Sequence, residues 1–333
     1  MTAAGGPAGR CLVVGQLPAP DWDLVRRVVP VERADLVLAD PGADLAHLGQ
    51  FEVIWRLFPA EIDGVVKDQL PEALESHPEV RWVHTSSAGI DHLAPLFQDR
   101  PNIILTHSAG VTALPIAEFV MGCLLQHCKR FPELGELQRR RRFERLQLRE
   151  LGDFRVVLFG MGAIGGAVVH RLAPFGCHLV GVRRDPSRPG PPQIAELFGP
   201  SEFARACQGA DALVLGAPLT RETEGAVNAH VLTQLAEGSV LVNVARGGLV
   251  DELALLAGLA AGRPAAAYLD AFVEEPLPAG SPLWTAPGVH ISPHLSWSSP
   301  HLARRTSEFF ADQLRRWLAE EPLLNRANPS AGY

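Results

Sequence analysis

The sequence predicts an α/β protein of two domains, each built around a parallel β-sheet. Its length of 333 residues is too great for one simple core and suits two domains. Short apolar runs, most of them β-rich and ending in Gly, Pro or a polar residue, alternate with helical patterns along most of the chain. Strands that alternate with helices imply right-handed crossover connections, which place successive strands parallel in one sheet.

The alternation is most regular from about residue 155 onward. Apolar residues recur at helical spacing between the predicted strands, one set at Ile164, Val168 and Leu172 and another around Leu255 and Leu259. This part of the chain therefore predicts one parallel sheet. Its strands are RVVLFG (155–160), HLVGV (178–182), DALVLGAP (211–218), VLVNVA (240–245), AAYLDAF (266–272) and HISP (290–293).

The first hundred residues alternate more raggedly and predict a second, smaller α/β unit. Its strands are CLVVG (11–15), EVIWRLF (52–58), RWVHTS (81–86) and NIILTHS (102–108). Residues 113–130 form a long apolar-rich helix suited to joining the two units. Near the C-terminus, residues 302–317 carry the apolar stripe of a helix that returns to the first unit. The stripe consists of Leu302, Phe309, Phe310, Leu314 and Trp317.

Composition disfavours several classes of function. The formal net charge of −7 disfavours a bulk role on nucleic acid or an anionic membrane. No apolar run approaches the roughly 20 residues of a transmembrane helix, and the start of the chain lacks the apolar stretch of a secretory signal. The five cysteines include no Cys-x-x-Cys pair and lie in mostly apolar surroundings. We therefore expect a cytoplasmic protein with buried thiols and no metal site.

The run QRRRRFERL (138–146) is strongly basic. We expect it to be the solvated face of a helix beside acidic neighbours. A role in contacting phosphate is the alternative.

A glycine-rich turn directly follows one predicted strand and opens a helix. The first glycine permits a tight turn, the second lets the backbone approach a pyrophosphate, and the third lets helix and strand pack closely. The helix N-terminus adds N–H groups and positive potential. A plain tight turn also uses glycine, but the position between strand and helix favours a dinucleotide site. The turn reads Gly160-Met161-Gly162-Ala163-Ile164-Gly165.

Two arginines end the next predicted strand, where a ribose ligand is expected. In dinucleotide-binding folds this strand end usually carries an Asp or Glu that binds the adenosine ribose hydroxyls. Here Arg183 and Arg184 follow the strand, and two guanidinium groups would clamp a 2′-phosphate through charge-assisted bonds. We therefore favour NADPH. Asp185 keeps NAD open, because a small shift of the strand end brings its carboxylate to the ribose.

Three further segments follow predicted strands at their carboxyl ends, where open α/β sheets bind ligands. Together with the turn, they make the chain resemble the D-isomer-specific 2-hydroxyacid dehydrogenase family, which includes glyoxylate/hydroxypyruvate reductases and phosphoglycerate dehydrogenases. The match spans most of the chain from about residue 80 to 300. It is carried by SAGID (87–91), Ala117-Glu118, GMGAIG (160–165), APLTRETEG (217–225), NVARGGLVDE (243–252), EEPLP (274–278) and SPH (292–294).

The resemblance implies that Arg246, Glu275 and His294 form the catalytic set, and the chemistry agrees. Reducing a 2-oxo acid needs a hydride at carbon and a proton at the carbonyl oxygen, which a histidine is suited to give. Glu275 would stabilise the imidazolium and fix its tautomer. Arg246 would polarise the ketone and hold the carboxylate in a fork. Each residue alone has a structural explanation, but all three occur in the family's order.

By the same resemblance, the backbone N–H groups of Ala88 and Gly89 bind the substrate carboxylate. Arg246 and His294 would contact both substrate and cofactor. The residues expected to line the nicotinamide and its ribose are Ala217, Pro218, Val244, Ala245 and Asp270. For Asp270, the alternative role is that of a strand-end cap.

The sequence departs from the family's commonest pattern at two places. Arg183 stands where many members carry Asp, which puts NAD in doubt. Trp297 follows the histidine motif and either shapes the pocket or packs between the domains.

We expect two Rossmann-like domains, one flavodoxin-like and one dinucleotide-binding, with a cleft between them. The substrate-binding domain combines residues 1–109 with 297–333, and the dinucleotide-binding domain is inserted at 110–296. The chain then crosses between domains twice. The resemblance also implies a homodimer built through the cofactor domain.

The function favoured is reduction of a small 2-oxo acid, such as glyoxylate or hydroxypyruvate, to the D-2-hydroxy acid. Nucleotide-sensing corepressors share the fold and the catalytic residues, and phosphite dehydrogenases also keep Arg, Glu and His, so both are alternatives. Formate dehydrogenase is disfavoured, because its histidine pairs with Gln rather than with the Glu275 seen here.

Overall fold

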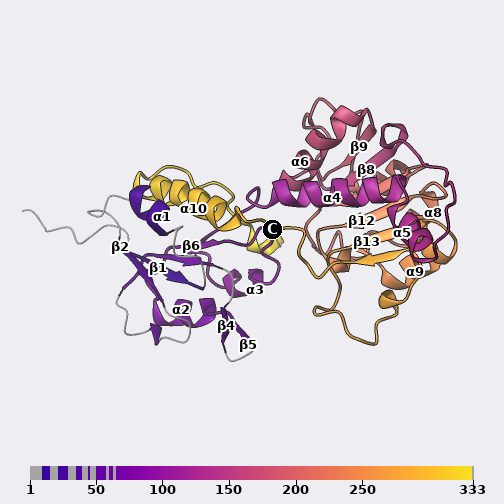
Figure 1. The fold of residues 1–333 in the computed structure, drawn as a ribbon. Coiled ribbons are helices and arrows are strands. Elements are labelled where there is room, and N and C mark those ends of the chain that lie inside the picture. The colour runs from indigo at the N-terminus through magenta and orange to yellow at the C-terminus, as the bar shows by residue number, and fades with distance from the viewer. Residues whose placement is uncertain are drawn as a thin grey trace, which may run out of the picture. The chain divides into compact units, whose positions relative to one another are not determined.

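Two parallel β-sheets organise the chain, one in each of two units (Figure 1). The computed structural model describes residues 10–15, 22–28, 35–39, 44–45, 50–57, 60–62 and 65–331. The first unit combines Met1–Thr112 with Ser299–Tyr333, and the second is Ala113–Ser298. The predicted α/β class with two parallel-sheet domains is confirmed. Within the described segments, no helix is long and apolar enough to cross a membrane.

The first unit contains a five-stranded parallel sheet in the order β2-β1-β3-β6-β7. Four of these strands match runs predicted from the sequence, although Phe58 of the run 52–58 lies outside the described residues. The edge strand β2, of four residues, has no counterpart among the predicted strands. The strands are β1 (Arg10–Val14), β2 (Asp35–Leu38), β3 (Val53–Arg56), β6 (Trp82–Thr85) and β7 (Ile104–His107), with a separate hairpin of β4 (Ala60–Ile62) and β5 (Val65–Lys67).

Helices cover both faces of this sheet. They are α1 (Trp22–Val28), α2 (Leu70–Ser76), α3 (Ala94–Phe97), α10 (Leu302–Leu318) and a 3₁₀ turn, η8 (Pro329–Ala331). Helices α1 and α10 lie side by side on one face, and α2 lies on the other (Figure 1). Of the stripe predicted within residues 302–317, Phe310 and Leu314 are buried and the other members are partly buried, and Phe310 stacks on Trp55 with ring centroids 3.9 Å apart.

The second unit contains a seven-stranded parallel sheet in the order β10-β9-β8-β11-β12-β13-β14. The strand order reverses between β8 and β11, the kind of switch point at which open α/β sheets bind ligands. Six strands match predicted runs, and only the three-residue edge strand β10 has no predicted counterpart. They are β8 (Arg155–Phe159), β9 (His178–Val182), β10 (Glu196–Phe198), β11 (Ala212–Leu215), β12 (Val240–Asn243), β13 (Ala266–Leu269) and β14 (Val289–Ile291).

Helices α4 and α6 cover one face of this sheet, and α7, α8 and α9 pack against the other. The helix predicted for residues 113–130 is α4, whose Ile116, Val120 and Leu124 are buried at helical spacing. The helices are α4 (Ala113–Cys128), α5 (Phe131–Arg139), α6 (Ala163–Leu172), α7 (Phe203–Ala206), α8 (Ala229–Gln234) and α9 (Glu252–Ala260), with 3₁₀ turns η3 (Leu151–Asp153), η4 (Ala173–Phe175), η5 (Pro200–Glu202), η6 (Gly247–Leu249) and η7 (Pro282–Trp284).

The prediction of a helix over the basic run 138–146 is wrong for most of that run. Helix α5 ends at Arg139, and Arg141 adopts a φ of 54°, a left-handed conformation that a continuing helix excludes. Glu136 pairs with Arg139 and its neighbour Arg140, and these side chains are largely exposed. The expected solvated surface with acidic neighbours is therefore present, mostly without the helix.

Candidate active site

The predicted site residues of the second unit follow strands along the carboxyl edge of its sheet. Because the strands are all parallel, their carboxyl ends meet at this one edge. The predicted turn follows β8, Arg183 and Arg184 follow β9, Ala217 and Pro218 follow β11, Val244 to Arg246 follow β12, Asp270 and Glu275 follow β13, and His294 follows β14. The predicted carboxylate-binding residues Ala88 and Gly89 lie in the first unit, after β6.

Two glycines of the turn are required by close backbone packing. Gly160 has a φ of 106°, and a Cβ atom there would lie 2.4 Å from the backbone nitrogen of Ala217. A Cβ on Gly165 would lie 2.1 Å from the carbonyl oxygen of Gly160. Any larger residue would push β8, β11 and α6 apart, so these glycines set how closely the elements pack.

The middle glycine faces open space. A Cβ on Gly162 would meet no atom within 4 Å, and both Gly162 and Ala163 are exposed. Gly162 is the N-cap of α6, and no side chain caps this helix end, so its first N–H groups remain available. This cradle fits the pyrophosphate of a dinucleotide, with Ile164 half-buried behind it.

The carboxylate of Asp185 is held by contacts within its own loop. The Asp185 carboxylate accepts hydrogen bonds from the backbone N–H of Ser187 at 3.1 Å and from its hydroxyl at 2.5 Å. It also pairs with Arg188 at 3.2 Å. The hydroxyl of Ser187 lowers the pKa of Asp185 below its ordinary value, and Arg188 and Arg183 add to the effect. Asp185 is thus a carboxylate engaged in its own loop rather than directed toward a ribose.

Arg246 extends from a turn that Asn243 holds at both ends. The Asn243 side chain donates to the carbonyl oxygen of Arg246 at 2.9 Å and accepts from the backbone N–H of Ala245 at 3.1 Å. Next along the chain, a Cβ on Gly247 would lie 1.9 Å from the backbone of Phe272, so β12 and β13 approach closely here. Sequence reasoning missed Asn243 as a support for Arg246, although it begins the NVARGGLVDE motif.

Glu275 and His294 form the pair that the sequence suggested. The Nδ1 atom of His294 lies 2.8 Å from Oε2 of Glu275, and both side chains are a little over one-third exposed. Oε1 of Glu275 accepts the backbone N–H of Phe272 at 2.9 Å, which orients the carboxylate. With Nδ1 committed to Glu275, Nε2 is the ring nitrogen left for chemistry.

Asp270 holds the loop that carries His294. Its carboxylate is buried and accepts the hydroxyl of Ser292 at 2.6 Å and the backbone N–H groups of Leu295 and Ser296 at 2.9 and 3.0 Å. His294 has a φ of 49°, which persists only where surrounding contacts impose it. The side chain of Asp270 therefore has a structural role in this loop, and its predicted contact with the nicotinamide ribose stays a prediction.

The loop after β6 presents two unpaired donors. Within the part of the chain that the structure describes, the backbone N–H groups of Ala88 and Gly89 donate to no acceptor, and both residues are half-buried. Adjacent N–H groups without acceptors form a concavity suited to an anion such as a carboxylate.

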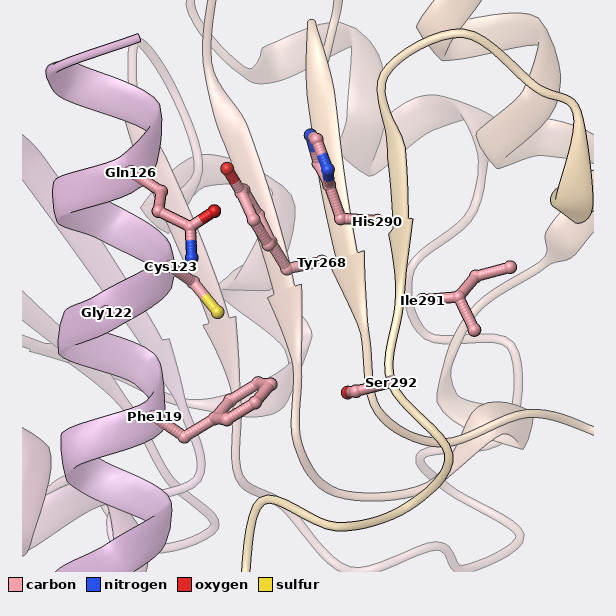
Figure 2. Close-up of a pocket in the computed structure, with 8 residues that line it drawn as sticks. All are labelled: Phe119, Gly122, Cys123, Gln126, Tyr268, His290, Ile291 and Ser292. Atoms are coloured by element: carbon pink, nitrogen blue, oxygen red, sulfur yellow. The ribbon is translucent and has the colours of Figure 1, made fainter. Parts of the chain in front are cut away.

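A cavity of about 320 Å³ lies in the second unit between α4 and the strands β13 and β14. Figure 2 shows Phe119, Cys123 and Gln126 of α4 facing the strand that bears Tyr268. The ring of Tyr268 stacks on His290 with centroids 4.3 Å apart. None of the predicted cofactor, substrate or catalytic residues lines this cavity, so it is distinct from the candidate active site.

Comparisons with known proteins agree with this geometry. Residues 121–296 match the family model described as D-isomer specific 2-hydroxyacid dehydrogenase, NAD binding domain. The chain is 30% identical over 276 residues to glyoxylate/hydroxypyruvate reductase A of Klebsiella pneumoniae, covering 78% of this chain and 87% of the relative. It is 27% identical to D-3-phosphoglycerate dehydrogenase of Methanocaldococcus jannaschii over 85% of this chain, which spans only 56% of that longer protein.

A solved structure shows the same fold over nearly the whole chain. It is the D-isomer specific 2-hydroxyacid dehydrogenase from Xanthobacter autotrophicus Py2 in complex with NADPH, with a TM-score of 0.83, 30% identity and coverage of 98% of this chain and 100% of that one. The glycine cradle, the carboxyl-edge arrangement and these similarities lead to one conclusion. The chain belongs to the D-isomer-specific 2-hydroxyacid dehydrogenase family and contains that family's NAD-binding domain.

Proposed function

We propose that this enzyme reduces a small 2-oxo acid, such as glyoxylate or hydroxypyruvate, to the D-2-hydroxy acid with NADPH. The observation that carries the proposal is the 2.8 Å contact between His294 and Glu275, at the same sheet edge as the turn that bears Arg246. Ketone reduction needs a proton donor with a fixed tautomer and a guanidinium that polarises the carbonyl oxygen, and both follow strands at this edge. The similarity to a glyoxylate/hydroxypyruvate reductase supports this substrate class.

The residues divide the reaction between them. NADPH, when bound, supplies the hydride, and the cradle at Gly160 to Gly165 would hold its pyrophosphate. Arg246 binds the substrate carboxylate and polarises the ketone oxygen, so that the carbonyl carbon becomes electrophilic. The N–H groups of Ala88 and Gly89 bind the same carboxylate. Nε2 of His294 donates the proton to the oxygen, and Glu275 stabilises the imidazolium before that step.

A kinetic panel tests this proposal directly. Glyoxylate, hydroxypyruvate and larger 2-oxo acids would be reduced with NADPH and with NADH, and phosphite would be offered with NADP⁺ and NAD⁺. We expect turnover of the small 2-oxo acids and none of phosphite. Turnover of phosphite alone would identify a phosphite dehydrogenase, and no turnover of any substrate would favour a nucleotide-sensing protein.

The first variant tests the cofactor assignment at the end of β9. Replacing Arg183 with Asp removes a guanidinium and adds a charge that repels a 2′-phosphate. One charge-assisted hydrogen bond contributes roughly 1.5–3 kcal/mol, so the KM for NADPH should rise about tenfold or more while that for NADH changes less. Arg205→Asp is the control, because Arg205 forms an exposed pair with Glu202 on α7 and its neighbouring turn, outside the loop after β9. A wild-type enzyme that prefers NADH would contradict the assignment.

We also propose that the enzyme is a homodimer formed through the second unit. Residues 140–149, here called the arm, are almost all exposed, and the Phe143 ring is fully exposed. The arm is anchored at its C-terminal end, where the backbone N–H of Arg149 donates to the carbonyl oxygen of Cys128 at 3.0 Å. An aromatic side chain projecting on an anchored arm favours burial against a second copy. The cavity beside Tyr268 is an apolar surface of the same unit that such an arm can cover (Figure 2).

Phe143→Ser tests the dimer. Burial of one such side chain contributes roughly 1.5–3 kcal/mol, and a symmetric dimer loses two of them, so the dissociation constant of the dimer should rise about 10²- to 10⁴-fold. Sedimentation velocity across a dilution series measures it. Leu253→Ser on α9 is the control, since Leu253 is 80% exposed outside the arm. A monomeric wild-type protein, or a variant that dissociates like the wild type, would rule out this interface.

The state of the cysteines supports a cytoplasmic location. We propose it because all five are free thiols and four of them are buried. Burial raises the pKa of the Cys123 and Cys207 thiols to about 12, which keeps them protonated and unreactive.

A further inference from the structure

Arg56 is a charged residue buried in the first unit, outside every motif of the family resemblance. It is the last residue of β3, and its side chain is only 3% exposed. Arginine is almost never fully buried unless its guanidinium is paired. We propose that Arg56 is a positioning residue that holds the Ser87–Gly89 loop in the shape that binds the substrate carboxylate. The inference deepens the proposed function and rests on it.

One side of the Arg56 guanidinium is fixed by Asp68. Nε and Nη2 donate to Oδ2 of Asp68 at 2.9 and 2.7 Å. The other carboxylate oxygen, Oδ1, accepts the backbone N–H of Leu70 at 3.1 Å, at the start of α2. Asp68 is therefore held by a helix start and in turn holds the guanidinium plane in one orientation.

The other side of the guanidinium reaches the loop. Nη1 donates to the hydroxyl oxygens of Thr85 and Ser87, each at 3.2 Å. The hydroxyl of Thr85 also accepts the backbone N–H of Ser87 at 3.3 Å, and the carbonyl oxygen of Ser87 accepts the N–H of Ser108 at 3.1 Å. Ser87 is thus held at its nitrogen, its carbonyl oxygen and its hydroxyl.

The geometry links this anchoring to substrate binding. Ser87 directly precedes Ala88 and Gly89, whose N–H groups donate to no acceptor within the described part of the chain. Directed donors bind an anion well only when the backbone that carries them is fixed in advance. The same role explains why a charge is kept in a buried strand end, where an apolar residue would cost no desolvation.

A second arginine of the same sheet provides a matched control. Arg81 pairs with Glu52 at 2.6 Å, and these residues immediately precede β6 and β3. This pair joins the amino ends of the two strands that Arg56 and Thr85 join at their carboxyl ends. Arg81 is 67% exposed and lies away from the loop, so its loss should leave carboxylate binding unchanged.

The test compares Arg56→Met, Arg56→Lys and Arg81→Met in the full-length enzyme. Misplacing a binding group by about 1 Å can cost on the order of 10²-fold, so Arg56→Met should raise the KM for glyoxylate about ten- to a hundredfold. The KM of Arg56→Lys should lie between those of Arg56→Met and the wild type. The lysine ammonium can reach either Asp68 or the loop, but it lacks the planar fork that binds both. The dissociation constant of NADPH, measured by fluorescence, should stay unchanged in all three. A purely structural role would instead lower the Tm and leave the KM of the folded enzyme unaltered.

Two further measurements keep the inference separate from the proposed function. Ser87→Ala removes one Arg56 contact without disturbing the Arg56–Asp68 pair, so it tests the link even if Arg56→Met does not fold. Titration calorimetry with oxalate reports carboxylate binding without turnover. Oxalate binding weakened by these variants in an enzyme that reduces no 2-oxo acid would sustain the inference and overturn the proposed function. Normal KM and oxalate affinity in folded Arg56 and Ser87 variants of an active enzyme would overturn the inference, and a wild type that neither binds oxalate nor turns over would overturn both.

Discussion

Replacing His294 with alanine is expected to lower kcat by about 10² to 10⁴, the range for losing a positioned proton donor. The substitution removes the ring whose Nδ1 contacts Glu275 and whose Nε2 is the proposed proton donor. The glycine cradle is unaffected, so NADPH binding should weaken only by the loss of the expected contact between His294 and the cofactor. Steady-state kinetics with glyoxylate, alongside fluorescence titration of NADPH, measures both quantities. His170→Ala is the control, since His170 is exposed on α6 and outside the site. Near-normal turnover without His294 would remove it from the mechanism.

Replacing Glu275 with Gln should shift the pH dependence rather than only lower the rate. Gln keeps the oxygen that accepts the Phe272 N–H but removes the negative charge 2.8 Å from the ring of His294. Without that charge the protonated ring of His294 loses its stabilising partner. Reduction needs the protonated ring, so its activity should be lost at lower pH than in the wild type. Oxidation needs the neutral ring and should persist to more acidic pH.

The measurement is kcat/KM against pH in both directions for the wild type and Glu275→Gln. If Glu275 and His294 act as a pair, the pH profiles of kcat/KM for reduction and for oxidation should both shift to lower pH. General damage to the site would lower kcat/KM in both directions without shifting either profile. Profiles that do not move would mean that His294 acts alone or with another partner.

Arg246→Lys is expected to lower kcat/KM by about 10² to 10³, comparable to removing one donor that stabilises a developing oxyanion. Lysine keeps the positive charge but has no planar fork with which to hold a carboxylate and a ketone oxygen together. The backbone turn should survive, because Asn243 binds main-chain atoms of Ala245 and Arg246 rather than the guanidinium.

Arg205→Lys is the control for Arg246, since Arg205 forms an exposed pair with Glu202 on the same unit. Turnover of Arg246→Lys close to the wild type, with an unchanged KM for glyoxylate, would reduce Arg246 to a turn residue.

The main elements of the fold were predictable from local patterns. A buried parallel strand must be apolar along its length, and a covering helix must place apolar residues on one side, so β8, β12 and α4 are visible in the sequence alone. The edge strands β2 and β10 were not predicted, although β14, an edge strand of three residues, was. The end of α5 depended on the backbone conformation of Arg141, which the basic composition of the run does not reveal.

The sequence by itself determined the parts of the site whose chemistry is local. The turn from Gly160 to Gly165 can be read because its glycines, strand and helix are consecutive, and Arg183 can be read because it ends the next strand. Only the tertiary structure decided that Asp270 holds the loop of His294 and that Arg56 contacts Ser87. The partners of Asp270 lie 22 to 26 residues away along the chain. Those of Arg56 lie 12 to 31 residues away. Such contacts form where parallel strands bring their carboxyl ends together, and no spacing in the sequence specifies which side chains then meet.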